Sequence, residues 1–179
     1  YHIVTPAMHL SKEDIAKLFN EKFGTAIDST PEQLTMKARE LLREKYTSYD
    51  IGITGGNFLI ADNGSIALTE NEGNARLTTT FPKIHIAIVG IEKVIPSMND
   101  LDLFWPILSS HGTGQNLTVY NTILGGPKQG NENDGPEEMY VILLDNGRTN
   151  LLAQKEQRQA LYCIRCGACL NACPVYKNI

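Results

Sequence analysis

Residues 83–90, KIHIAIVG, are the stretch that decides the fold. The run is short, rich in β-branched residues and apolar at almost every position. Such a run is typical of a strand buried on both faces, as in a parallel sheet with helices on each side. We expect His85, inside this strand, to be a core histidine rather than a ligand.

Further strands are expected before and after this stretch, because short apolar runs alternate with Gly, Asn, Asp and Pro. The expected strands are 50–54, 65–69, 117–126 and 138–146, with a short element at 57–61 and a helix at 97–110. Buried strands that alternate with helices predict an α/β fold. We expect an open, mostly parallel sheet with helices on both faces.

Two helices are expected before the first strand, at about residues 11–46. Ser11 and Thr30 have the features of helix N-caps, Pro31 occupies a first helical position, and Gly24 is a plausible stop between the helices. These helices and the strands form the predicted domain, residues 1–147. Residues 148–179 are predicted to be a helix, over residues 148–162, followed by a separate cysteine-bearing segment.

Charge and composition exclude several classes of protein. The net charge is -4 and the Lys and Arg residues are scattered, which does not favour nucleic-acid binding. The sequence has no apolar stretch near 18 residues, so no membrane span is expected. It also lacks an initiator Met, and we expect a fragment of a longer protein.

All four cysteines lie in one run, C-x2-C-x2-C-x3-C-P, at Cys163, Cys166, Cys169 and Cys173. This spacing is typical of ferredoxin-type iron–sulfur ligands, where the fourth cysteine binds the other of two clusters. Cys163, Cys166 and Cys169 are therefore predicted to bind one [4Fe–4S] cluster, and Cys173 a second. A zinc site is the alternative, but it usually needs a second, distant pair of ligands.

The ligand count has two consequences. Four cysteines are too few for two clusters, so we expect the clusters to be absent or incomplete in this fragment. Thiols confined to one short run also suit a reducing cytoplasm rather than a disulfide scaffold.

Four stretches together resemble a known family: GITGGNFLIADNGSIALTENEGNARL (52–77), SSHGTGQNLTVYNTILGGP (109–127), EEMYVILLDNGR (137–148) and CIRCGACLNACPVY (163–176). In this order they resemble the iron–sulfur subunits of bacterial lactate-utilisation systems, the lactate utilisation protein B family, and this chain resembles their central part. The resemblance implies a LUD domain, similar in fold to the sugar-phosphate isomerase and CoA-transferase superfamily.

The resemblance also implies a function. Family members act with other subunits in a cytoplasmic complex that oxidises L-lactate to pyruvate. The iron–sulfur subunit relays electrons through two [4Fe–4S] clusters, and the chemistry on lactate lies in a partner. The alternative is a LUD domain that itself binds or transforms a small anion, with the cluster as a redox sensor or structural element.

Three loops are candidates for such an anion site, because they follow or precede predicted strands and carry glycines, amides and charges. The candidate residues are Thr54, Gly55, Gly56 and Asn57, then Glu70, Asn71, Glu72, Asn74 and Arg76, and finally Thr113 and Gly114. Arg76 has the fork geometry for a carboxylate or phosphate. Tight turns and solvated charges remain open as structural explanations.

Overall fold

The computed structural model describes residues 9–176, and the chain divides after Ser48 into two compact units. The first unit contains helices α1 (Lys12–Phe23) and α2 (Pro31–Ser48). Ser11 and Asp14 cap each other's backbone N–H groups at the start of α1, and Gly24 ends it in the left-handed region. Thr30 and Gln33 make the same reciprocal pair before α2. Both helix starts and the Gly24 stop confirm the predictions.

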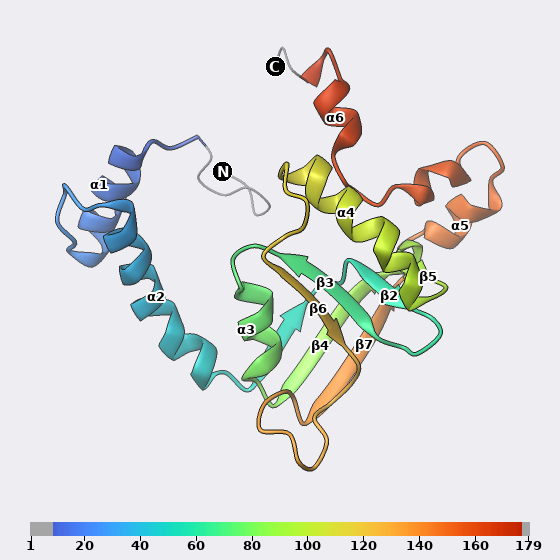
Figure 1. Cartoon of the computed structure of the whole chain (residues 1–179), viewed down its shortest axis with the longest axis horizontal. Coiled ribbons are helices and arrows are strands. Elements are labelled where there is room, and N and C mark those ends of the chain that lie inside the picture. Colours follow the sequence, from blue (N-terminus) through green and yellow to red (C-terminus); the bar gives the residue numbers. More distant parts are fainter. Residues whose placement is uncertain (1–8, 177–179) are drawn as a thin grey trace. The chain divides into compact units, whose positions relative to one another are not determined.

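The second unit contains the strands and the cysteine run (Figure 1). Its strands are β1 (Ile51–Thr54), β2 (Phe58–Ile60), β3 (Ile66–Glu70), β4 (Ile84–Gly90), β5 (Val94–Ile95), β6 (Tyr120–Leu124) and β7 (Glu138–Leu144). Its α-helices are α3 (Asn74–Thr80), α4 (Leu101–Gly112), α5 (Arg148–Ala153) and α6 (Ala168–Ala172). Short 3-10 helices lie at η1 (Ile91–Lys93), η2 (Met98–Asp100) and η3 (Arg158–Tyr162).

The predicted α/β fold and parallel sheet are confirmed. Strand β4 lies at the centre of a three-stranded sheet, with β1 and β7 parallel to it on either side. Burial along β4 alternates instead of being continuous, which corrects the expectation of a strand buried on both faces. His85, Ala87 and Val89 are buried, whereas Ile88 is 40% exposed.

A second sheet, which the sequence did not predict as separate, has the strand order β5-β2-β3-β6. Strand β3 runs antiparallel to both β2 and β6. Ile66 and Leu68 from this sheet form one buried cluster with Ala87 and Val89 from β4, so the two sheets pack against each other. The burial of these side chains supplies most of the contact energy between the sheets.

Helix α4 packs on the second sheet. Leu101, at the start of α4, is buried with Phe58 and Ile60, and Phe104 and Trp105 pack against the same cluster. The rings of Phe58 and Phe104 are stacked at 4.9 Å between centroids. Ile164 of the cysteine segment packs against the same cluster.

Two expectations about helices were wrong. The single helix expected over residues 148–162 is broken, because Gln154 has extended backbone angles and separates α5 from η3. Helix α3 lies where the sequence predicts a loop, since its seven residues are mostly polar or β-branched and have little helical periodicity. The loop that was predicted to carry a site therefore continues into this helix.

Candidate functional site

The three candidate loops meet in space, and their polar side chains bond mainly to one another. The side chain of Asn57 accepts a hydrogen bond from the Thr69 amide at 2.9 Å. Asn71 donates to Gln115 at 3.0 Å and accepts from the Val119 amide at 3.1 Å. These bonds satisfy the amides locally and connect the loops across long sequence separations.

Glu70, at the end of β3, and Asn74, the first residue of α3, accept the amide hydrogens at the start of this helix. The Glu70 carboxylate accepts the amide hydrogens of Ala75 at 2.8 Å and of Arg76 at 2.7 Å. Asn74 accepts the Ala75 amide as well. Glu70 therefore acts as the helix cap, and its negative charge lies where an external anion would have to bind.

The remaining loop residues are more open. Glu72 is exposed and accepts only a long bond, 3.3 Å, from the Asn71 amide. The Arg76 guanidinium lies 5.6 Å from the centre of the Tyr120 ring, a cation–π distance. Thr113 donates to the Gln115 side chain at 2.6 Å, and Gly114 follows in the left-handed region at φ 73°. Arg76 is thus the candidate whose charge remains available.

The glycines of the first loop differ in their surroundings. A Cβ on Gly56 would lie 2.8 Å from Val89 Cγ2, so this glycine is required for close packing. Gly55 has ordinary space around it. Close packing therefore explains the glycine at position 56 but not the glycine at position 55.

Thr54 bonds to His85, which lies in the neighbouring strand. Thr54 Oγ1 lies 2.7 Å from His85 Nε2, and the His85 side chain is 1% exposed. Burial lowers the pKa of His85, because the charged imidazolium is disfavoured away from water. His85 Nδ1 has no hydrogen-bond partner within residues 9–176. The pair is consistent with the predicted core role of His85.

The cysteine run lies against α4 and η1, not apart from the α/β unit. Ile164 packs on the buried cluster under α4, and the Lys93 ammonium donates to the Ile164 carbonyl at 3.4 Å. Asn171 in α6 donates to the His111 carbonyl at 2.8 Å, at the end of α4. Figure 1 shows α6 next to α4. Contacts on both sides of the run therefore hold it in place.

A charged cluster, which we call the Glu92 cluster, lies beside Cys163. Glu92, Lys93, Arg148 and Arg165 belong to it. Glu92 is in η1, directly after β4, and its carboxylate is 6% exposed. It pairs with Arg148 Nε and lies 3.6 Å from Arg165 Nη2. A cleft of about 490 Å³ beside the cluster is lined by Glu92, both arginines and Cys163.

Burial of the Glu92 carboxyl would by itself raise its pKa, and this is the largest single influence. The hydrogen bond from Arg148 and the charges of Arg148 and Arg165 together outweigh it, so the pKa of Glu92 lies below its usual value. The carboxylate is therefore charged at neutral pH and compensates cations that would otherwise repel each other.

The cysteines suit a cluster by donor chemistry. All four are free thiols, with Cys163 and Cys169 exposed and Cys166 and Cys173 half-buried. Soft thiolates at these intervals are the ligands that iron–sulfur clusters use. Within residues 9–176, however, no three His, Cys, Asp or Glu side chains are gathered as a metal site.

The fold and the cysteine run define a class: an α/β domain that carries ferredoxin-type cysteines on its surface. The LUD domain family matches residues 1–144, and the chain belongs to that family. This confirms the family expectation made from the sequence. Among residues 9–176, each helix is too short or too polar to cross a bilayer.

Two curated relatives match almost the whole chain. Lactate utilization protein B of Shouchella clausii is 48% identical over 178 residues, 99% of this chain and 37% of the relative. The "Uncharacterized electron transport protein YkgF" of Escherichia coli is 45% identical over the same shares of both chains. The chain thus spans little more than a third of the relatives it matches.

One solved structure is also similar, a DUF162 family protein from Deinococcus radiodurans. It is 19% identical, with a TM-score of 0.41, and the match covers 74% of this chain and 84% of that one.

The Glu92 cluster was missed by sequence reasoning. The available signal was its position, since an acidic residue follows directly after the carboxyl end of a parallel strand, where sites in α/β sheets gather. Arg148 and Arg165 lie 56 and 73 positions further along the chain. Their common partner is visible only in the folded structure.

Proposed function

We propose that this chain is part of the iron–sulfur electron-transfer subunit of a cytoplasmic complex that oxidises L-lactate to pyruvate. The observation that supports it best is the ferredoxin-type cysteine run held on a LUD domain. The names of the relatives, lactate utilization protein B and an electron transport protein, agree with this assignment. The other subunits of the complex are the expected partners.

Cys163, Cys166 and Cys169 are proposed to hold one [4Fe–4S] cluster, and Cys173 a second, with the remaining ligands elsewhere in the full-length protein. When bound, the clusters supply one-electron transfer. The role of this chain is to hold and orient the thiolates near the protein surface, where a partner can approach. Oxidation of lactate itself is assigned to a partner subunit.

The decisive experiment uses the full-length protein with reconstituted clusters. Lactate is added anaerobically with and without the other subunits, and the visible absorbance of the clusters is followed. We expect bleaching only when the partners are present. Bleaching by lactate with the isolated subunit would overturn the relay assignment, and no bleaching with all subunits would overturn the lactate assignment.

A second candidate function is binding of a small anion by the LUD domain. The observation that favours it is Arg76, which lies where the three loops converge and is paired with Tyr120 rather than with a carboxylate in residues 9–176. Calorimetric titration with carboxylates and phosphate tests it. Binding that Arg76→Ala weakens, and that Arg43→Ala in α2 leaves unchanged, supports this function; the absence of any binding would rule it out for these anions.

A further inference from the structure

Glu92 occupies an unusual position in this fold. It follows the central strand of the parallel sheet, it is 6% exposed, and it faces two arginines from distant segments. Gly90, two residues before it, leaves the room that this carboxylate needs, because a Cβ there would lie 2.2 Å from Glu92 Oε2. Such an arrangement keeps the carboxylate folded back under the cysteine segment instead of pointing into solvent.

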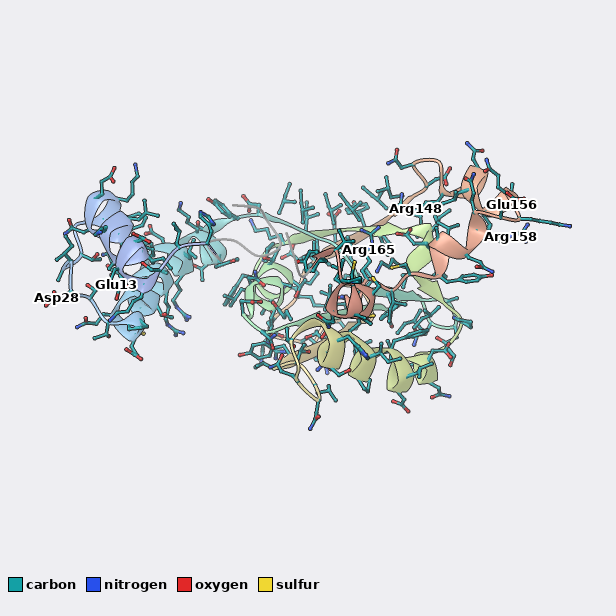
Figure 2. The ribbon with its side chains drawn as sticks, turned by 90° about the horizontal axis from the view of Figure 1, so that it is seen from above. Glu13, Asp28, Arg148, Glu156, Arg158 and Arg165 are labelled. Carbon is teal, nitrogen blue, oxygen red and sulfur yellow. The ribbon has the colours of Figure 1, made fainter. Side chains whose placement is uncertain are left out.

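The two arginines connect different parts of the chain to this carboxylate. Arg148 begins α5, is 20% exposed and also donates to the Asp145 carbonyl at 3.0 Å. Arg165 stands between Cys163 and Cys166 and has a left-handed backbone, φ 64°, although it is not glycine. Figure 2 shows Arg148 and Arg165 on these separate segments. The Arg165 guanidinium reaches the Glu92 carboxylate from this loop, at 3.6 Å.

The charges of the cluster do not cancel. Lys93, Arg148 and Arg165 carry three positive charges around the single carboxylate of Glu92, and Lys93 interacts electrostatically with Cys163 as well. Removing the carboxylate would leave the three cations to repel one another in a half-buried place. The segment with Cys163 and Cys166 would then lose the Arg165 contact, and on the η1 side it would keep the hydrogen bond from Lys93 to the Ile164 carbonyl.

We propose that Glu92 is the positioning residue of the iron–sulfur segment: by binding Arg148 and Arg165 together, it fixes the loop of Cys163 and Cys166 on the LUD domain and keeps a positive environment beside these two cysteines. The role of Glu92 in holding cluster ligands rests on the proposed iron–sulfur function. Its attachment of the loop to the LUD domain can be tested without lactate. Arg165 and Lys93 are the groups that give the cysteines their electrostatic surroundings.

Amide hydrogen exchange in the iron-free full-length protein tests the attachment. Helix α6 provides the reporters, because the amides of Leu170 and Asn171 donate to the Gly167 carbonyl. In Glu92→Gln these amides are expected to exchange about two- to fivefold faster, the factor expected from the loss of one largely exposed ion pair. Amides of β4 are expected to keep their protection. Glu92→Asp should restore part of it.

The matched control is Glu156→Gln, which removes an exposed carboxylate between α5 and η3 and should leave the exchange unchanged. If Glu92→Gln unfolds the whole unit, the same exchange measurement is made on Arg165→Gln. The Arg165 side chain is 69% exposed, so its removal does not disturb the core. The proposal would be overturned if the α6 amides of the folded variant, Glu92→Gln or Arg165→Gln, exchanged at the same rate as in the unchanged protein.

The electrostatic part is tested on the reconstituted full-length protein. Arg165→Gln removes a positive charge beside the cluster ligands, so the midpoint potential of the nearest cluster should become more negative, because reduction adds negative charge. An unchanged potential would refute this part. A failure of lactate-dependent reduction would refute the proposed function while leaving the exchange result valid, so the two failures are distinguishable.

Discussion

Thr54 Oγ1 and His85 Nε2 lie 2.7 Å apart, on the first and the central strand of the parallel sheet. The imidazole is buried, and its pKa lies below the usual value. A pKa that is lowered on folding means that the unfolded chain binds the proton more readily. His85 therefore contributes stability that is fully present above its unfolded pKa of about 6.5 and is lost as the pH falls from there through the folded pKa.

We predict that the unfolding free energy falls between pH 7.5 and pH 5.5, by at most about 1.4 kcal/mol per pH unit from this residue. Urea denaturation at several pH values measures it. His85→Gln should flatten the dependence in this range, whereas His111→Gln, at an exposed position, should preserve it. An equally steep dependence in His85→Gln would contradict the assignment.

The second prediction concerns the cap of α3. Glu70→Ala removes the acceptor of two amide hydrogen bonds and should lower the unfolding free energy by about 1–2 kcal/mol. Glu72→Ala, two residues away and exposed, should change it by less than about 0.5 kcal/mol. Equal effects of the two substitutions in urea denaturation would argue against the capping role.

The third prediction separates the two adjacent glycines of the first loop. Gly56→Ala forces a Cβ to within 2.8 Å of Val89 and 3.0 Å of Ile66, so we expect a loss of about 1–3 kcal/mol from overpacking. Gly55→Ala meets only the Ile88 carbonyl, at 3.9 Å, and should be nearly neutral. Thermal unfolding of the two variants checks the difference, and a stable Gly56→Ala would show that the sheets can separate locally.

The fourth prediction concerns iron. The full-length protein should bind about eight irons per chain after anaerobic reconstitution, and Cys166→Ser should reduce this to about four. Tyr162→Phe, just outside the run, is the control and should keep the full content. This 179-residue chain, with four cysteines, should hold fewer than about eight irons. Iron and acid-labile sulfide are counted in each case, and a full complement in Cys166→Ser would exclude Cys166 as a ligand.

Much of the fold could be predicted from local chemistry. The caps at Ser11 and Thr30, the stop at Gly24 and the strands around His85 follow from residue types within a few positions of each other, so they were found in the sequence. The break at Gln154 and helix α3 were not found, because short helices depend more on their tertiary contacts than on propensity.

The candidate loops show a similar division. Glycines and polar residues next to strands identified the three loops in the sequence, and the structure connects Asn57 with Thr69 and Asn71 with Gln115 by hydrogen bonds. The role of each side chain was not predictable, because a carboxylate that caps a helix and a carboxylate that binds a ligand cannot be distinguished in the sequence. Glu70 proved to be a cap only once its distance to the Ala75 amide was known.

By itself, the sequence determined the family of the protein, the α/β class and the four thiols of the cysteine run, since these depend on residue identity and spacing alone. Only the tertiary structure decided where that run lies. Glu92, Arg148 and Arg165 are far apart in the chain, and their attraction acts through space at a few ångströms. Long-range electrostatic contacts of this kind have no period and no motif, so folding has to bring them together before they can be recognised.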